Sequence, residues 1–372
     1  MSQFVAGARA PKRGFVVAAL MAAAVQGLAA CGGSADPGER RDLTSIPKGQ
    51  EIPCELHSDP RLAEMSDAGV GLASELGLAP GRYALPANKA PTQLVVMFHG
   101  HGNDSCSWRR HLQNVAALGA VAVAMDYSGQ AQTPIENYGW CVRAGAADSI
   151  AAARYFLNRY PSIQKVYAFS ISMGANVAGY ALYSPLAQRA DGSPLFDHWV
   201  AAEGVHNLAE QYLLARAIAP AVPDAAVAQQ EIEIENGGSL EQAPQAYTEI
   251  STVLHSQKLA YLKSAVLIHG IDDGLVPTTQ SREMFVGLTL AGVPTHLYTV
   301  GATGVGEAGT TATSIVLGPL TGAAGQTYES PLAGHGWEGS ETHLVIRTAL
   351  DQLYALLGGA TVSIGETPVP GL

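Results

Sequence analysis

Short runs of apolar residues alternate with stretches of helical length from about residue 80 onward. Each run is bounded by turn residues, and continuous apolar runs are typical of strands that are buried on both faces of a parallel sheet. The pattern predicts strands over residues 94–98, 120–125, 165–169, 198–202, 265–268 and 295–300. Strands separated by helical stretches indicate an α/β architecture with a mostly parallel central sheet and helices on both faces.

An Ala-rich stretch over residues 144–160 carries apolar residues at helical spacing and is followed by Pro161. A proline does not continue a helix, so we expect the helix to end there. Such a helix supplies the crossover connection that two parallel strands need. The chain has 372 residues, of which 47% are hydrophobic, and this is ample for one large domain with a layered core.

The segments around the predicted strands divide the chain further. Residues 207–262 show no strong strand pattern, and we expect a mostly helical cap that shapes a substrate pocket. Residues 301–333 are rich in Gly and Thr and are expected to form a long excursion of the chain. We place the main domain at residues 80–358 and a C-terminal tail at residues 359–372.

The first thirty residues have the pattern of an export signal. Arg9, Lys12 and Arg13 precede an apolar run over residues 14–25, and no acidic residue occurs before residue 31. The apolar run is too short to span a bilayer. We therefore predict a signal peptide over residues 1–30.

Cys31 lies in a segment, residues 28–34, that resembles the lipobox of bacterial lipoproteins. The resemblance implies that the cysteine is lipidated and becomes the new N-terminus, with several acyl chains that hold the protein on a membrane. Gly32 after the cysteine implies the outer membrane or the cell surface. Residues 31–79 then form a spacer and N-terminal segment. An ordinary signal peptide that contains Cys31 by chance is the alternative.

Three further cysteines, Cys54, Cys106 and Cys141, fall in the part of the chain that follows the predicted signal. Export would place them in a compartment that permits disulfides, and at most one bridge can form among them. Cys106 and Cys141 are expected in loops near the same end of the sheet, whereas Cys54 lies in the N-terminal segment. We predict a disulfide between Cys106 and Cys141, with three free thiols as the alternative.

The chain is acidic, with a formal net charge of −11 at pH 7. An acidic body repels a polyphosphate backbone, so we do not expect nucleic acid as a partner. Charge alone does not select a small substrate.

A turn centred on a serine follows the predicted strand at residues 165–169. Residues 170–174 read Ser-Ile-Ser-Met-Gly, with helix-forming residues directly after them. This strand, turn and helix resemble the nucleophile elbow of the α/β-hydrolase superfamily, and the resemblance implies Ser172 as the nucleophile. The turn is strained, so the residues two before and two after the serine must be small. Ser170 stands where the superfamily usually has Gly, and a plain polar turn is the alternative.

A serine nucleophile needs a base that takes its proton and an acid that orients the base. Residues 269–277 read His-Gly-Ile-Asp-Asp-Gly-Leu-Val-Pro and resemble the superfamily segment His-Gly-x-x-Asp-x-x-Val-Pro. The match implies Asp273 as the triad acid, with Asp272 as the second candidate. A turn in which the aspartates cap a helix that starts at Pro277 is the structural alternative.

The candidate base is His335, which lies between Gly334 and Gly336 near the C-terminus. Its position completes the order Ser, Asp, His that the resemblance implies. Flanking glycines let the backbone approach closely and leave the imidazole on a loop. His343 is the alternative base, but its position in a helix predicted from about residue 342 favours a packing or surface role.

An oxyanion hole requires two backbone N–H groups aimed at the charge that develops on the attacked carbonyl. By resemblance, one N–H belongs to Met173, directly after the nucleophile. The other belongs to His101, because residues 98–104 resemble the superfamily's His-Gly oxyanion loop.

The same loop also resembles the His-x-His-x-Asp-His pattern of metallo-β-lactamase-like hydrolases, through His99, His101 and Asp104. That spacing gathers imidazoles on one side of a zinc ion. Asn103 replaces the pattern's Asp, and Asp104 replaces its third His. We therefore expect no metal and no other cofactor.

The ordered set of segments, from about residue 90 to 350, resembles the α/β-hydrolase superfamily, including prolyl-oligopeptidase-like and dienelactone-hydrolase-like enzymes. The resemblance implies hydrolysis of a small or polymeric carboxylic ester through an acyl-enzyme, by analogy rather than by deduction. A peptidase or oligopeptidase and a non-catalytic surface lipoprotein are the alternatives. Glu203, after the predicted strand at residues 198–202, is a further candidate to contact the site, but acids in loops are usually solvated, and we expect it to be solvated.

Overall fold

A computed structural model describes the core of the chain and several short strands. The described residues are 68–69, 72–74, 77–79, 81–127, 139–219, 223–271, 273–301, 320–321, 327–328, 335–336, 338–339 and 343–371. The predicted signal peptide, Cys31, Cys54, Asp272 and most of residues 301–333 lie outside them. Among the described residues, no helix is both long and apolar enough to cross a membrane.

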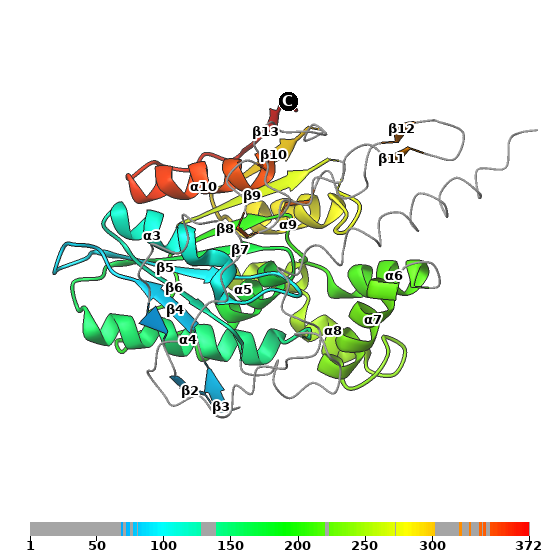
Figure 1. The fold of residues 1–372 in the computed structure, drawn as a ribbon, viewed down its shortest axis with the longest axis horizontal. Coiled ribbons are helices and arrows are strands. Elements are labelled where there is room, and N and C mark those ends of the chain that lie inside the picture. Colours follow the sequence, from blue (N-terminus) through cyan, green and yellow to red (C-terminus); the bar gives the residue numbers. More distant parts are fainter. Residues whose placement is uncertain are drawn as a thin grey trace, which may run out of the picture.

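A sheet of nine strands forms the centre of the fold (Figure 1). In spatial order the strands are β1 (Ala68–Gly69), β4 (Gly81–Ala84), β6 (Val121–Met125), β5 (Gln93–Phe98), β7 (Lys165–Ile171), β8 (His198–Ala202), β9 (Ser264–Gly270), β10 (Thr295–Val300) and β13 (Gly365–Val369). The pairs β1–β4 and β4–β6 are antiparallel, and all other neighbours are parallel. The predicted mostly parallel sheet is confirmed. Two short antiparallel pairs lie outside this sheet: β2 (Leu72–Ser74) with β3 (Gly77–Ala79), and β11 (Leu320–Thr321) with β12 (Thr327–Tyr328).

Each of the six predicted strands is present, and β8 and β10 begin and end at the predicted residues. The sequence analysis missed β13, which lies within the segment interpreted as a C-terminal tail. This strand pairs with β10 at the edge of the sheet, and most of its side chains are exposed. It therefore lacks the continuous apolar pattern that identified the inner strands.

Helices cover both faces of the sheet (Figure 1). One face is covered by α3 (Arg109–Ala117) and α10 (Leu344–Leu357), and the other by α4 (Val142–Arg159), α5 (Met173–Tyr183) and α9 (Thr279–Leu290). Each inner strand contributes side chains to both layers: in β5, Val95 and Met97 join the first core, and Leu94, Val96 and Phe98 join the second. The fold is the doubly covered α/β architecture that the pattern predicts.

The range predicted as a cap contains three α-helices and a 3-10 helix. They are α6 (Leu208–Ile218), α7 (Pro223–Asn236), α8 (Pro244–Ile250) and η4 (Thr252–Leu259). In Figure 1, α6, α7 and α8 lie together beside the sheet. Arg143 near the start of α4 holds this group, because its guanidinium contacts Glu235 at 3.1 Å and Glu249 at 2.9 Å.

The predicted disulfide between Cys106 and Cys141 is wrong. Cys141 is not part of a disulfide, and its thiol is buried in the core directly before α4. Cys106, in the short helix η2 (Ser105–Trp108), is disulfide-bonded, and its partner lies outside the described residues. Placing both residues in loops at the same end of the sheet did not account for the inward direction of the Cys141 side chain.

Candidate active site

Ser172 lies between the end of β7 and the start of α5. Its backbone has φ 53° and ψ −127°, a conformation that residues other than glycine rarely adopt. Three hydrogen bonds hold this backbone. The Ser172 N–H donates to Ala202 O at 3.0 Å, and the Ser172 carbonyl accepts from Ala175 N at 3.0 Å and Val205 N at 3.1 Å. The surrounding fold therefore maintains the strained turn that a nucleophile elbow requires.

The residues two before and two after Ser172 are both tightly enclosed. A Cβ on Gly174 would lie 2.3 Å from Phe98 O and 2.5 Å from His99 O, so only glycine fits. Ser170 is buried, and its hydroxyl accepts the indole N–H of Trp199 at 3.0 Å. A serine is accommodated at this position because it has a polar partner in the core.

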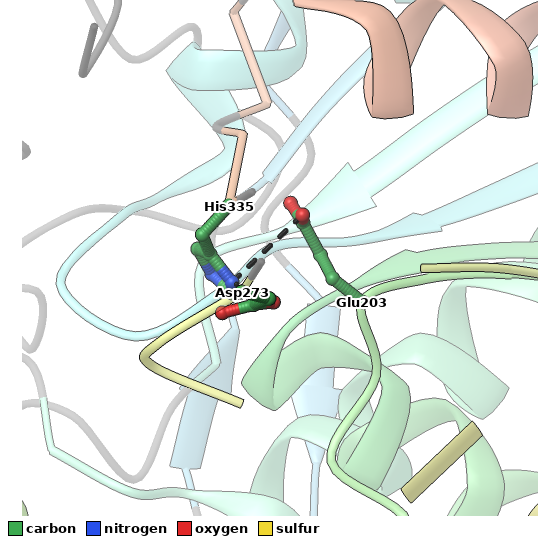
Figure 2. Close-up of side chains that lie close together, drawn as sticks. All are labelled: Glu203, Asp273 and His335. Carbon is green, nitrogen blue, oxygen red and sulfur yellow. Dashed lines mark hydrogen bonds and ion pairs between the residues drawn. The ribbon is translucent and has the colours of Figure 1, made fainter. Parts of the chain in front are cut away.

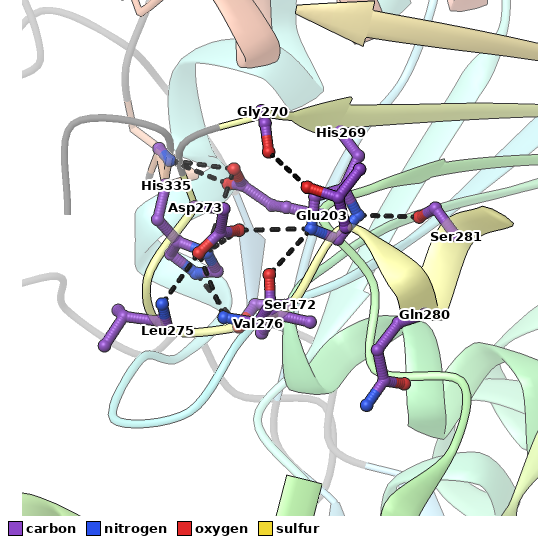
Figure 3. A network of polar contacts seen from close by, with 12 residues as sticks. Ser172, Glu203, His269, Gly270, Asp273, Leu275, Val276, Gln280, Ser281 and His335 are labelled. Atoms are coloured by element: carbon purple, nitrogen blue, oxygen red, sulfur yellow. Dashed lines mark hydrogen bonds and ion pairs between the residues drawn. The ribbon is translucent and has the colours of Figure 1, made fainter. Parts of the chain in front are cut away.

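His335 connects the predicted nucleophile and the predicted acid (Figure 3). Its Nε2 lies 3.2 Å from Ser172 Oγ, and its Nδ1 lies 2.8 Å from Asp273 Oδ2. These contacts require the tautomer in which Nδ1–H donates to the carboxylate and Nε2 accepts from the hydroxyl. The structure thus places the three predicted side chains in one hydrogen-bonded line, and the alternative base His343 lies directly before α10 instead.

Asp273 is held by the backbone of its own turn. Its Oδ1 accepts from Leu275 N at 2.8 Å and from Val276 N at 2.9 Å. The second candidate acid, Asp272, lies outside the described residues. One carboxylate oxygen of Asp273 therefore organises the turn and the other faces His335, but Asp273 does not cap a helix, because α9 begins at Thr279 with no side-chain cap.

His269, at the end of β9, supports the same carboxylate. Its Nε2 lies 3.3 Å from Asp273 Oδ2 and 2.8 Å from Val276 O, and its Nδ1 lies 2.7 Å from Ser281 Oγ (Figure 3). Burial by itself raises the pKa of Asp273, but His335 and the His269 hydrogen bond outweigh burial, and the net shift is downward. Asp273 is therefore kept ionised beside His335.

Glu203 is a second carboxylate beside His335 (Figure 2). Its Oε2 lies 3.8 Å from His335 Nδ1, and the side chain is fully buried, so the expectation of a solvated loop residue is wrong. Burial raises the pKa of Glu203 above its usual range, while the His335 charge opposes the shift and Asp273 adds to it.

The pKa of His335 is set by opposing effects. Burial lowers it, but the charges of Asp273 and Glu203 outweigh burial and raise the pKa from 6.5 to about 9. The environment therefore stabilises the imidazolium.

The loop after β5 lies against Ser172, since a Cβ on Gly100 would be 3.2 Å from Ser172 Cβ. The Gly100 N–H donates to Glu338 Oε1, and Asn103 Nδ2 donates to Glu338 Oε2 at 2.8 Å. Burial raises the pKa of Glu338 to about 7, although the Gly100 amide opposes the shift. A buried carboxylate thus fixes the loop that carries His101, a predicted oxyanion donor.

The other predicted donor, Met173, is the first residue of α5 and is buried directly after Ser172. The side chain of His101 turns toward the cap, where its Nε2 pairs with Glu231 of α7. The oxyanion loop is therefore tied to the cap as well as to Glu338.

The residues of the alternative zinc pattern have separate partners. His99 stacks on Tyr127 with ring centroids 3.9 Å apart, and burial lowers its pKa to about 4. Asp104 caps η2 by accepting from Cys106 N at 2.8 Å. In the described part of the chain, the group of potential ligands that lie within reach of one another is Glu203, Asp273 and His335. His99, His101 and Asp104 are not in that group, so the loop does not bring its own potential ligands within reach of one another.

The model of the prolyl oligopeptidase family, Peptidase_S9, matches residues 106–304, which include Ser172 and Asp273. The chain belongs to the prolyl oligopeptidase family. Family membership confirms the resemblance to the α/β-hydrolase superfamily.

Solved structures share the fold at low sequence identity. A puromycin-hydrolyzing peptidase of Mycobacterium tuberculosis has a TM-score of 0.54 and 17% identity, covering 82% of this chain and 41% of the peptidase. A Pyrobaculum calidifontis esterase has a TM-score of 0.53 and 16% identity, covering 80% of this chain and 87% of the esterase. Thermogutta terrifontis esterase 2, phosphorylated by paraoxon, has a TM-score of 0.51 and 15% identity. The match covers 79% of this chain and 94% of the esterase.

Some of the matched solved structures are much longer than this chain. The chain spans 36% of the length of the Pyrococcus horikoshii acylaminoacyl peptidase and 41% of the mycobacterial peptidase. Among curated proteins, none matches the chain.

Glu203 was weighed as a contact of the site but expected to be solvated, and no role was predicted for His269, Glu338 or Glu231. Two of them follow or end strands, as the predicted triad acid does: Glu203 follows β8, and His269 lies within the end of β9. Functional side chains of α/β folds gather at the carboxyl ends of the strands, and this placement was the available signal.

Proposed function

We propose that the protein hydrolyses carboxylic esters through an acyl-enzyme formed on Ser172. The observation that supports this proposal is the hydrogen-bonded line from Ser172 Oγ through His335 to Asp273, with contacts of 3.2 and 2.8 Å. Ser172 also has the strained backbone that presents a nucleophile, with φ 53°.

In the first step, Ser172 Oγ attacks the ester carbonyl while His335 Nε2 takes the hydroxyl proton. Asp273 stabilises the imidazolium, and the backbone N–H groups of Met173 and His101 bind the oxyanion. The tetrahedral intermediate collapses, and His335 gives its proton to the departing alkoxide. His335 then takes a proton from water, which attacks the acyl-enzyme carbonyl. The second tetrahedral intermediate collapses, His335 returns the proton to Ser172 Oγ, and the carboxylic acid is released.

Peptides are the second candidate substrate class, because the family is named for an oligopeptidase activity. Esters come first because the two esterases compared above share the fold over 87% and 94% of their own lengths. Both reactions use the same triad, and an amide differs in that its amine must be protonated before it leaves.

The same proposal places the enzyme outside the cytoplasm, on a membrane, with the lipid on Cys31. The basic stretch, the short apolar run and the lipobox-like segment over residues 28–34 support this location. Incorporation of an alkyne-tagged fatty acid into the full chain, and its absence in Cys31→Ala, tests the anchor. Equal incorporation in both proteins would place the lipid elsewhere.

A fluorophosphonate probe tests the nucleophile, since such probes react with activated serines. We expect labelling of the wild type and none of Ser172→Ala. Ser193→Ala is the matched control, because this hydroxyl bonds Asp191 in a surface loop and should leave labelling unchanged. No labelling of the wild type would favour a non-catalytic lipoprotein. A panel of p-nitrophenyl esters and aminoacyl p-nitroanilides then separates esterase from peptidase activity.

A further inference from the structure

His335 lies beside two buried carboxylates rather than one (Figure 2). Its Nδ1 is 2.8 Å from Asp273 and 3.8 Å from Glu203, and the side chains of both acids are fully buried. A triad requires only one of them. A second ionisable carboxylate in this position is costly to bury unless it has partners.

The backbone of Glu203 is held in a rare conformation. Glu203 has φ 42°, a left-handed value that a side chain with a Cβ disfavours. Its N–H donates to Ile268 O at 2.7 Å, in the neighbouring strand β9. The fold thus maintains strain that directs this side chain toward His335.

The carboxylate of Glu203 accepts hydrogen bonds from the backbone directly after His335. The Gly336 N–H donates to Glu203 Oε1 at 2.8 Å and to Oε2 at 3.0 Å. Gly336 is enclosed on its other side, since a Cβ there would lie 2.5 Å from Ile346 Cγ1 and 2.7 Å from His343 Nδ1. The His335 backbone is therefore fixed between α10 and Glu203.

Among the described residues, the titratable groups that shift the pKa of Glu203 include His335, Asp273 and Glu338. Asp273 and Glu338 are acids, and the imidazolium of His335 is the cation of this group that offsets an ionised Glu203. The charge of Glu203 and the protonation of His335 are consequently linked.

We propose that Glu203 is a second acid of the site, a positioning residue that fixes His335 through Gly336 and stabilises its imidazolium together with Asp273. This role rests on the proposed serine mechanism, in which His335 is protonated during turnover. A purely structural Glu203 would hold the Gly336 backbone and leave the proton affinity of His335 unchanged.

Glu203→Gln separates these two roles. The amide oxygen retains an acceptor for the Gly336 N–H, while the negative charge is removed. We expect the acid limb of the kcat/KM profile to move to lower pH by about one to three units, the usual effect of a charge at this range. An acid limb that stays at the wild-type pH would overturn the proposal, whatever happens to the maximal rate.

Asp197→Asn is the matched control. Asp197 is also a buried carboxylate, but it lies directly before β8, at the opposite end of that strand from Glu203, and pairs with Arg189 and Lys263. Removal of its charge should leave the acid limb in place. A limb displaced as far in Asp197→Asn as in Glu203→Gln would show a general charge effect and would contradict the specific role.

Asp273→Asn tests the same idea without a change at Glu203, in case Glu203→Gln does not fold. In this variant Glu203 is the remaining carboxylate beside Nδ1. We expect the residual activity to have an acid limb above about 6.5, the ordinary histidine pKa. A limb at or below that value would show that the charge of Glu203 does not outweigh the effect of burial on His335, and the assignment of a second acid would fall.

Failure of the proposed function has a different signature. If Ser172→Ala retains hydrolysis or probe labelling, the serine mechanism itself is wrong. The acid limb is therefore measured on the Ser172-dependent rate, so that an unmoved limb reflects Glu203 alone.

Discussion

Trp199 donates its indole N–H to Ser170 Oγ at 3.0 Å, and both side chains are fully buried. The Ser170 hydroxyl in turn faces Val200 O at 3.4 Å. Ser170 occupies the elbow position at which the superfamily usually has glycine, and glycine offers no acceptor to the indole. Serine at this position therefore supplies the acceptor that the buried Trp199 indole needs.

Ser170→Gly should destabilise the protein even though it restores the usual elbow residue. The Trp199 N–H would lose its partner in the core, and a buried unpaired donor costs about 1–3 kcal/mol of unfolding free energy. Denaturant unfolding of the wild type and Ser170→Gly measures this loss. Trp199→Phe provides the control, because Ser170→Gly should cost less in a background without the indole donor. Equal costs in the two backgrounds would contradict the pairing.

Gly174→Ala should disrupt the elbow and the oxyanion loop together. The added Cβ would lie 2.3 and 2.5 Å from the carbonyl oxygens of Phe98 and His99, and these backbone atoms cannot rotate away. Overpacking of this kind costs about 1–3 kcal/mol or more. We expect a lower unfolding temperature and a loss of fluorophosphonate labelling.

Gly358→Ala is the control for that substitution. Gly358 is exposed after α10, and its Cβ would meet Ala355 O at 3.3 Å and Tyr354 O at 3.5 Å. Its stability should change by no more than about 0.5 kcal/mol, as for most surface substitutions. If Gly174→Ala were as stable and as reactive as Gly358→Ala, the close approach of the Phe98 and His99 carbonyl oxygens to Gly174 would be refuted.

The buried part of the sheet was predictable because its strands are apolar on both faces. The boundaries of β8 and β10 follow directly from this pattern. β13 was not predictable on the same grounds, since its exposed residues include Glu366 and Pro368. An edge strand is identified by the neighbour with which it pairs, and pairing is not visible in the sequence.

The site residues likewise divide into those that a local sequence motif predicts and those that only contacts between distant residues reveal. Ser172, Asp273 and His335 each lie in a local motif with turn residues at fixed offsets. Glu203 and Glu338 have no such motif, and an isolated acid after a strand is usually solvated. Their burial results from contacts with Gly336 and Gly100, which are distant in sequence.

The rate of hydrolysis should depend on a proton with an unusually high pKa. The neutral imidazole of His335 is the base, so activity appears as pH rises through its pKa, which Asp273 and Glu203 raise to about 9 against the effect of burial. We expect the acid limb of kcat/KM to have its midpoint near pH 9 rather than near 6.5. Spontaneous ester hydrolysis is subtracted with Ser172→Ala. A midpoint at or below 6.5 would show that the two carboxylates do not outweigh the effect of burial on the pKa of His335.

The two described cysteines should differ in their reactivity. Cys141 is a buried thiol outside any disulfide, and burial, Glu235 and Glu231 raise its pKa, so it should resist alkylation in the native protein and react after unfolding. Cys106 is disulfide-bonded and should react only after reduction. Sequential alkylation with three reagents of different mass, before unfolding, after unfolding and after reduction, assigns each cysteine by mass spectrometry. Cys141→Ser is the control, because Cys106 should still require reduction in this variant. Finding that both cysteines require reduction in the wild type would restore the Cys106–Cys141 bridge that the structure contradicts.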